Sequence, residues 1–263
     1  MKQVIEYLNG MGIRDTAPVP FEKCRVLNER RLKGRTDIKT ALMFLVPFYT
    51  GEFCEGNVSK YAVARDYHLF AEILGQDIKA RFGDEMMIFS DTSPIDEVKA
   101  AAYGGLGLIG ENGLLVTEKY GCYVFIGEIL TNKEADYLPD QTKKCPACGR
   151  CKELCPAKDG LPCLSALTQK KGELTEREQD YIRRHGLVWG CDICMDACPY
   201  SVRVRESGFV TPVRFFTTHL KSRLTKEDIK GDISDRAYAW RGKQVLMRNL
   251  EIFSRDQITA ELL

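Results

Sequence analysis

The chain has 263 residues, with 38 lysines and arginines against 37 aspartates and glutamates, and 11 cysteines. This length suits about one or two domains with a buried core, and a formal charge of +1 excludes a polycationic coat or an acidic tail as the basis of function. The longest apolar run, residues 41–47, is too short to cross a membrane. Glu6 lies where a secretory signal would need apolar residues, so we expect a cytoplasmic protein.

Residues 1–135 show alternating strand and helix signals, which predict a separate α/β domain. Segments rich in β-branched and aromatic residues are expected to be strands, at residues 41–49, 86–90, 114–117 and 122–131. Between the first two, residues 58–82 carry apolar side chains three and four positions apart, which is typical of an amphipathic helix. Its apolar stripe consists of Tyr67, Phe70, Ala71, Leu74, Ile78 and Phe82.

A second, shorter helix is expected to begin at Pro94, with Ser93 as its N-cap, and to end at the glycines 104 and 105. Asp91 lies between the strand 86–90 and this helix. Open α/β sheets often bind ligands at such strand ends, but the position alone favours a helix cap or a solvated loop.

The segment Gly105–Gly110 matches the pattern G-x-G-x-x-G. A dinucleotide site would need this pattern after a strand and at the start of a helix, whereas here it follows a predicted helix and leads into a strand. A tight connection with positive φ at a glycine is therefore favoured. The stretch 100–110 is also free of charge, so a flat ligand could lie against it.

Eight of the eleven cysteines lie between residues 145 and 198, as Cys-x2-Cys-x2-Cys-x3-Cys-Pro followed by a single cysteine and Cys-x2-Cys-x3-Cys-Pro. The first run is that of bacterial ferredoxins, in which the fourth cysteine binds the other cluster. We therefore expect two 4Fe-4S clusters, one bound by Cys145, Cys148, Cys151 and Cys198, the other by Cys155, Cys163, Cys191 and Cys194.

Structural zinc is the alternative for paired Cys-x2-Cys units, but it does not explain two Cys-x3-Cys-Pro endings. Disulfides are not expected in a reducing cytosol. The three remaining cysteines have apolar or aromatic neighbours and are predicted to be buried thiols: Cys24, Cys54 and Cys122.

Together with the eight cysteines, four segments resemble the epoxyqueuosine reductase family: 59–68, 91–96, 105–112 and 127–131. The resemblance implies a cobalamin-dependent enzyme that reduces the epoxide of epoxyqueuosine in tRNA to queuosine. Its electrons would come from a low-potential donor of the ferredoxin or flavodoxin type, through two 4Fe-4S clusters. The corrinoid reductive dehalogenases are a more distant resemblance.

The implied fold is α+β, with an α/β cobalamin-binding domain (1–135), a ferredoxin-like double-cluster domain (136–205) and a C-terminal helical segment (206–263). Asp91 matches the proton donor of the family, a role that requires a raised pKa, and we expect burial to supply it. The resemblance places four residues against the corrin: Ser59, Gly107, Asn112 and Leu115. It implies no protein ligand to cobalt, so His68 is interpreted as a scaffold residue.

Two departures from the family pattern concern the substrate. Glu111 stands where the family usually has lysine, and the chain ends at Leu263, soon after residues 239–249 resemble the start of a helical region that contacts tRNA. A short paralogue acting on a different small substrate is therefore one alternative. A non-catalytic ferredoxin-like electron-transfer protein is another, and a corrinoid-protein reactivator is a third.

Residues 199–223 form a basic segment with interleaved aromatic residues. Such a composition suits a phosphate and base surface, but the aromatic side chains could equally pack on the cluster domain. The five basic residues are Arg203, Arg205, Arg214, Lys221 and Arg223, and the aromatic residues are Tyr200, Phe209, Phe215 and Phe216.

Overall fold

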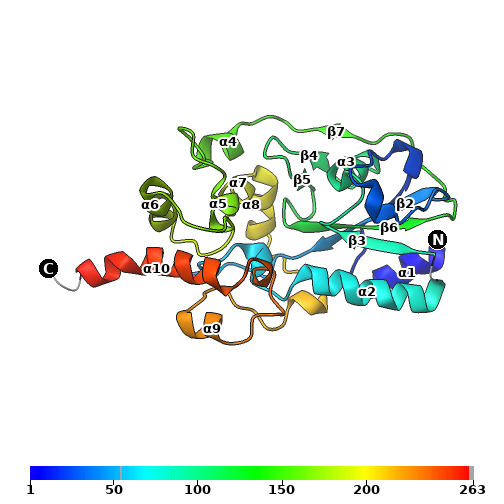
Figure 1. Cartoon of the computed structure of the whole chain (residues 1–263). Helices are drawn as coiled ribbons and strands as arrows, with labels where there is room; N and C mark the ends of the chain where they lie inside the picture. The colour runs from blue at the N-terminus through cyan, green and yellow to red at the C-terminus, as the bar shows by residue number, and fades with distance from the viewer. Residues whose placement is uncertain (54, 84, 261–263) are drawn as a thin grey trace.

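The computed structural model describes residues 1–53, 55–83 and 85–260. A four-stranded sheet lies at one end of the molecule and short helices at the other, and the terminal helix packs along these helices before its end projects beyond them (Figure 1). The strand order is β1-β2-β6-β3 and every pairing is antiparallel. The strands are β1 (Thr16–Pro20), β2 (Thr40–Pro47), β3 (Met87–Ser90) and β6 (Val124–Thr131).

This mixed architecture confirms the expected α+β class. The antiparallel sheet is unlike the α/β domain that we expected for residues 1–135, because an α/β sheet is mostly parallel. The sheet is nevertheless covered on both faces, and all eight residues of the central strand β2 are buried. This burial explains why residues 41–47 read as an unbroken apolar run.

Side chains from alternate positions of β2 enter two different cores, as the pleat of a strand requires. Leu42, Phe44 and Val46 pack against α1 (Lys2–Gly10) and α2 (Tyr67–Phe82). Ala41, Met43 and Leu45 face the other way, toward the three alanines of α3 (Glu97–Tyr103).

Both predicted helices of this half begin later than expected. Helix α2 starts at Tyr67, because the Asp66 carboxylate caps it by accepting the His68 N–H (2.9 Å). Helix α3 starts at Glu97 with Asp96 as its N-cap, so the prediction of Ser93 and Pro94 as N-cap and first residue is wrong. The Ser93 hydroxyl instead bonds the backbone of Ile95.

The glycine stretch is the expected connection between a helix and a strand. Gly104 caps α3, and Gly105 has φ +80° before β4 (Leu108–Ile109). The predicted strand at 114–117 is the short β5 (Leu115–Val116), which pairs with β4. On its other edge β4 pairs in parallel with β7 (Lys143–Lys144).

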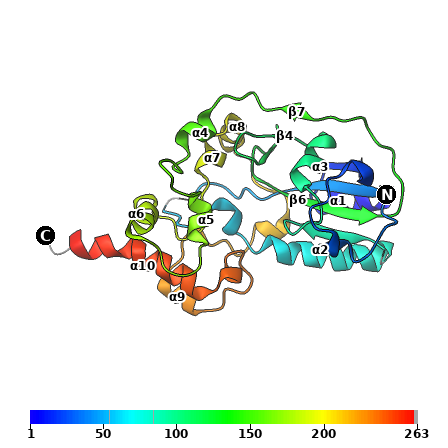
Figure 2. The ribbon, with the colours of Figure 1, turned by 45° about the horizontal axis from the view of Figure 1, so that its top comes forward.

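The second half consists of short helices around the cysteine motifs (Figure 2). They are α4 (Arg150–Leu154), α5 (Leu164–Thr168), α6 (Glu176–His185), α7 (Ile193–Asp196), α8 (Pro199–Glu206), α9 (Lys226–Lys230) and α10 (Lys243–Ala260). Single 3-10 turns occur at Phe21–Lys23, Glu29–Leu32, Lys60–Ala62, Arg214–Phe216 and Ala239–Arg241. Among the described residues, no helix is long and apolar enough to cross a bilayer.

Several segments pack far from their sequence neighbours. Val213 and Phe216 belong to the core between the sheet and α2, whereas Val58 and Val63 join a core with residues 224–250. On α10, the buried Asn249 donates its amide to the carbonyls of Thr168 (2.7 Å) and Val188 (2.9 Å). The division into domains at residues 135 and 205 stays a prediction.

Candidate active site and cluster motifs

Asp91 follows the last residue of β3 and adopts a left-handed backbone conformation, with φ +64°. Such a conformation costs a non-glycine residue on the order of 1 kcal/mol and often occurs at functional sites. The Asp91 N–H donates to Glu97 Oε2 (3.2 Å). Asp91 Oδ2 accepts the Tyr67 hydroxyl (2.9 Å) and lies 3.3 Å from His68 Nε2. The structure thus joins two of the segments on which the family resemblance rests.

His68 lies between two carboxylates, because its Nδ1 is also 2.8 Å from Asp66 Oδ1. The hydrogen bonds to Asp66 and Asp91 raise the pKa of His68 to about 9. At neutral pH the ring is therefore an imidazolium that donates from both nitrogens.

The pKa of Asp91 is lowered, first by the hydrogen bond from His68 and then, against the opposing effect of burial, by that from Tyr67. The expectation that burial would raise this pKa is wrong, since the side chain is 59% exposed and has two donors. Asp91 is a carboxylate at neutral pH. To act as a proton donor, Asp91 must first receive a proton, and the adjacent His68 imidazolium can supply it.

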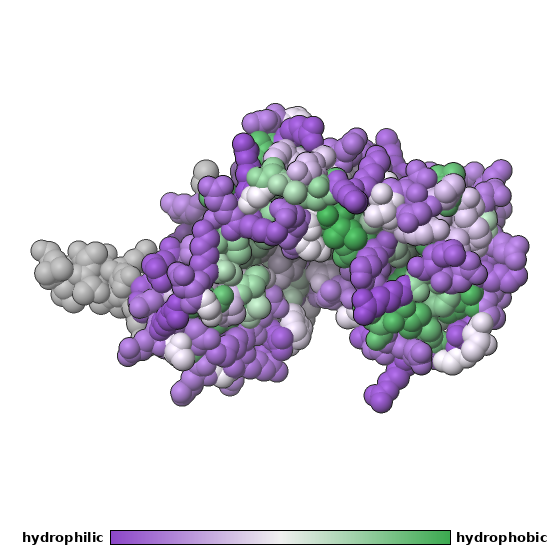
Figure 3. All heavy atoms as spheres, turned by 90° about the horizontal axis from the view of Figure 1, so that it is seen from above, coloured by the Kyte–Doolittle hydropathy of each residue, from purple (hydrophilic) through white to green (hydrophobic). Residues whose placement is uncertain are grey.

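Asp91 lines a pocket of about 150 Å³ together with Tyr67, Glu97, Leu115 and Cys122. The lining combines the carboxyl groups of Asp91 and Glu97 with apolar side chains. Tyr67 stacks on Phe125, with ring centroids 4.3 Å apart. Seen from above, the surface is mostly hydrophilic, with separate apolar patches on both halves of the molecule (Figure 3).

The sequence analysis did not single out two acids of this region. Glu97 lines the pocket, and burial raises its pKa to about 8. Glu128 on β6 has no exposed surface, and burial raises its pKa to about 7. Their positions in the sequence carry no signal for this, because their burial comes from the packing of α3 against the sheet.

Of the four predicted corrin contacts, Leu115 and Asn112 lie at or beside the Asp91 pocket. Leu115 lines it, and Asn112 Nδ2 lies 3.8 Å from the sulfur of Cys122, another lining residue. Gly107 instead lines a separate pocket of about 170 Å³. A Cβ atom at Gly107 would come within 2.7 Å of the Val116 carbonyl oxygen, so the β4–β5 contact requires glycine there.

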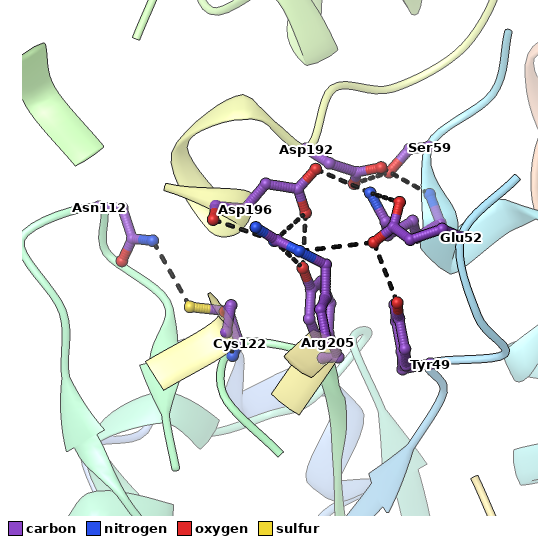
Figure 4. Close-up of polar contacts among 11 residues, drawn as sticks. Tyr49, Glu52, Ser59, Asn112, Cys122, Asp192, Asp196 and Arg205 are labelled. Atoms are coloured by element: carbon purple, nitrogen blue, oxygen red, sulfur yellow. Dashed lines mark hydrogen bonds and ion pairs between the residues drawn. The ribbon is translucent and has the colours of Figure 1, made fainter. Parts of the chain in front are cut away.

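Ser59 is buried in a polar network beside the second cysteine motif (Figure 4). Its hydroxyl donates to Asp192, whose other carboxylate oxygen accepts the Lys60 N–H (2.7 Å). The Lys60 ammonium pairs with Asp196 (2.7 Å), and Arg205 pairs with the same carboxylate (3.4 Å). The network therefore fixes the helix α7, which carries Cys194, against residues 59–60.

The four cysteines predicted to bind the second cluster influence one another electrostatically. Burial raises the pKa of Cys194 to about 11, with contributions from Cys155, Cys163 and Cys151. Burial likewise raises the pKa of Cys191 to about 12, with smaller contributions from Asp192, Cys194 and Cys163. Mutual repulsion of this kind requires thiols gathered in one region.

Among the cysteines predicted for the first cluster, Cys145 and Cys198 pack in the same apolar core as Cys122. In the described ranges, no three His, Cys, Asp or Glu side chains converge on a single metal ion. A cubane places its own iron and sulfide atoms between its four thiolates, so its ligands lie farther apart than those of one ion.

The prediction that the outlying cysteines are buried thiols is confirmed for Cys122, whereas Cys24 is only partly buried. Partial burial still raises the pKa of the Cys24 thiol to about 12. Cys54 lies outside the described residues.

In the basic segment, the aromatic side chains pack inward. Phe216 is fully buried, Phe215 lies under Arg65 (4.5 Å from its guanidinium carbon to the ring centroid), and Phe209 contacts Tyr120. Lys221 pairs with Asp228 (2.8 Å). These contacts favour the packing interpretation over an RNA surface. Glu111 forms an ion pair with Lys152 of the first cysteine motif (2.5 Å), which balances its charge.

Curated proteins named epoxyqueuosine reductase are similar to most of this chain. The protein from Synechocystis sp. is 31% identical over 214 residues, which are 73% of this chain and 71% of that protein. The chain belongs to the epoxyqueuosine reductase family. The Gloeobacter violaceus epoxyqueuosine reductase is 32% identical over 70% of this chain, but the match spans only 62% of its length. No family model matches the chain.

Solved epoxyqueuosine reductases have the same fold. The Streptococcus thermophilus structure has a TM-score of 0.73 at 24% identity, covering 98% of this chain and 83% of that one. A second epoxyqueuosine reductase was crystallised with an epoxyqueuosine-modified tRNA-Tyr stem loop. It has a TM-score of 0.71 at 19% identity, covering 96% of this chain and 80% of that one.

Proposed function

We propose that this chain is a cobalamin-dependent iron–sulfur oxidoreductase that reduces the epoxide of epoxyqueuosine in tRNA to queuosine. The observation that carries the proposal is the Asp91 pocket, in which a carboxylate is held by Tyr67 and an imidazolium beside an apolar wall. Family membership supports the reaction.

The residues present fit the groups that this reaction needs. The two interlocked sets of four cysteines supply the thiolates for two 4Fe-4S clusters. The uncharged residues 100–110 and the apolar side chains of Leu115, Val124 and Phe125 suit the face of a corrin. We assign cobalamin contacts to Ser59, Gly107, Asn112 and Leu115. When bound, cobalamin would supply low-valent cobalt as the reductant.

The side chains of this protein can supply the protons that the reaction consumes. Reducing an epoxide to an alkene and water consumes two electrons and two protons. The His68 Nε2–H can pass its proton to Asp91 Oδ2, and Asp91 can pass it to the departing oxygen. The Tyr67 hydroxyl orients the same carboxylate oxygen. General acid catalysis of this kind typically contributes 10²–10⁴-fold to a rate.

A basic groove of about 530 Å³ is the surface that we propose for the tRNA backbone. Its basic lining residues are Lys171, Arg241, Lys243 and Arg248, and its lining contains no acid. Beside it Trp240 is 60% exposed, with the Arg241 guanidinium carbon 3.7 Å from its ring centroid. Phosphate contacts and base stacking both suit such a surface.

The groove predicts a salt-dependent interaction with tRNA. The double variant Lys171→Ala with Arg241→Ala should weaken tRNA binding roughly tenfold and reduce the salt slope by about 2, because two phosphates are then no longer neutralised by the protein. Lys79→Ala, on the exposed face of α2, is the matched control. An unchanged tRNA affinity of the double variant would mean that the tRNA binds to a surface other than this groove.

The function itself is tested in cells and with the purified protein. We expect tRNA from a strain without this protein to accumulate the epoxide nucleoside, and wild type but not Asp91→Asn to restore queuosine. The protein reconstituted anaerobically with hydroxocobalamin should show cobalamin absorption bands. An unchanged nucleoside profile with bound cobalamin would indicate a different small substrate. If no cobalamin binds at saturating supply, the protein is instead an electron-transfer protein that receives electrons from a ferredoxin or flavodoxin.

A further inference from the structure

Two glutamates lie beside Asp91, and the proton path through His68 does not use them. Glu97 is the first residue of α3, and its Oε2 accepts the N–H of Asp91 (3.2 Å). Its side chain lines the same pocket as the Asp91 carboxylate. Any change of charge on Glu97 therefore acts directly on the position of Asp91.

Glu128 is the unusual member of the pair. It lies on β6, opposite Met43 of β2 and Phe89 of β3, and its exposed fraction is 0%. Within the described residues, neither of its carboxylate oxygens has a hydrogen-bond partner. An ionised carboxylate left without partners in such a place is very costly, so the protonated form is favoured.

The charged groups around the pair do not neutralise it. Asp91 and Asp96 face Glu97, and Lys99 is paired with Asp96 (3.0 Å). Arg31 donates to the Thr92 carbonyl (2.5 Å) rather than to either glutamate. In the part of the chain that the structure describes, neither glutamate forms an ion pair. The Ser93 hydroxyl, which lowers the pKa of Glu128, already donates to the Ile95 carbonyl.

A carboxyl group that is removed from water and has other acids nearby ionises less readily. Burial, with smaller contributions from Glu128 and Asp91, raises the pKa of Glu97 to about 8, and burial raises that of Glu128 to about 7. Glu97 therefore keeps its proton at neutral pH. This proton lies at the pocket where the proposed reaction needs its second one.

We propose that Glu97, backed by Glu128, is the second proton source of this pocket and recharges Asp91 during turnover. The inference rests on the proposed function. In the proposed reaction the bound cofactors would supply two electrons, both C–O bonds of the epoxide break, and a C=C bond forms. The released oxygen takes one proton from His68 and one from Glu97, each through Asp91, and leaves as water. Solvent then reprotonates His68 and Glu97. Glu97 acts through Asp91 and is a positioning residue.

A titration without substrate tests the proton itself. Infrared spectra of the reconstituted protein should contain a carboxylic-acid C=O band at pH 6 that disappears by about pH 9, as both glutamates ionise. Glu97→Gln keeps an acceptor for the Asp91 N–H and should remove or shift this band. Asp91→Asn, which removes a group that is already ionised, should retain it. Absence of the band from wild type at pH 6, or an unchanged band in Glu97→Gln, would overturn the inference.

The pH profile of epoxide reduction is the second readout. Wild type should lose rate in two steps as pH rises, near pH 8 with Glu97 and near pH 9 with His68. In Glu97→Gln we expect roughly 10²-fold lower activity at pH 7, and the first step should be absent. Glu97→Asp should recover part of the rate, and Glu72→Gln on the exposed face of α2 should match wild type. A Glu97→Gln profile that retains both steps would contradict the proposal.

The two readouts separate the two proposals. If wild type shows the infrared band but reduces no epoxide, the proposed function fails while the protonated pair stands. If it reduces the epoxide without the band, the function stands and the second proton comes from another group.

Discussion

Neighbouring side chains at the Asp91 pocket hold opposite protonation states. Hydrogen bonds keep Asp91 ionised and His68 protonated, whereas burial favours the protonated form of Glu128. One fold thus separates the pKa values of two carboxyl groups by giving each a different number of donors. Asp91 has two side-chain donors, and Glu128 has no partner within the described residues.

The buried carboxyl predicts a stability that falls as pH rises. Glu128 is protonated in both folded and unfolded chains below its usual pKa of 4.5, and only the unfolded chain ionises between there and about 7. The stability of wild type should therefore fall across this window, relative to Glu128→Gln, by roughly 3 kcal/mol at about 1.4 kcal/mol per pKa unit. Thermal unfolding at pH 4.5 and pH 8 measures the difference. A constant gap between the two proteins would show that Glu128 ionises normally.

At the scale of elements, the contact between β2 and β6 holds the site together. Gly127 of β6 lies opposite Phe44 of β2 and Ser90 of β3, the residue before Asp91. A Cβ atom at Gly127 would overlap the ring of Phe44. The glycine leaves room for the aromatic ring to cover the sheet.

Gly127→Ala should destabilise the protein by about 1–3 kcal/mol, because it overpacks a buried position. Phe44→Leu should also destabilise when made alone, since it leaves space at the core. The double variant should be more stable than the sum of the two changes predicts, and denaturant unfolding of all four proteins measures this coupling. If the two changes in unfolding free energy were strictly additive, the sheet would have shifted so that the new methyl group does not contact Phe44.

Elements with strong local signals were predictable from sequence, and those created by tertiary pairing were not. The strands at 41–49 and 122–131 and the stripe of α2 follow from apolar content and spacing. The two-residue strand β7 carries no such signal, because it is a strand only through its pairing with β4. Asp91 could be found from its family motif, whereas the nearness of Glu97 and Glu128 appears only once α3 is packed against the sheet.

At the scale of the whole molecule, the proposed crossed ligation of two clusters makes a specific prediction. Alanine at Cys198 should impair the same cluster as alanine at Cys145, and alanine at Cys155 the same cluster as alanine at Cys163. Each variant should retain about four of roughly eight irons, and the remaining paramagnetic signal identifies the surviving cluster. Cys24→Ala should leave both clusters intact. If Cys155→Ala and Cys151→Ala removed the same signal, the ligation would not be crossed.

The amide of Asn249 joins segments made long before it during synthesis. The carbonyls of Thr168 and Val188 belong to the stretch that separates Cys163 from Cys191, and they receive its two hydrogen bonds. During translation Cys163 and Cys191 leave the ribosome before the hydrogen bonds of Asn249 can form. The strands of the sheet likewise leave it before Val213 and Phe216, which later pack on them. Asn249 can therefore link the two ends of this stretch, and so hold Cys163 and Cys191 relative to each other, only once synthesis has passed residue 249.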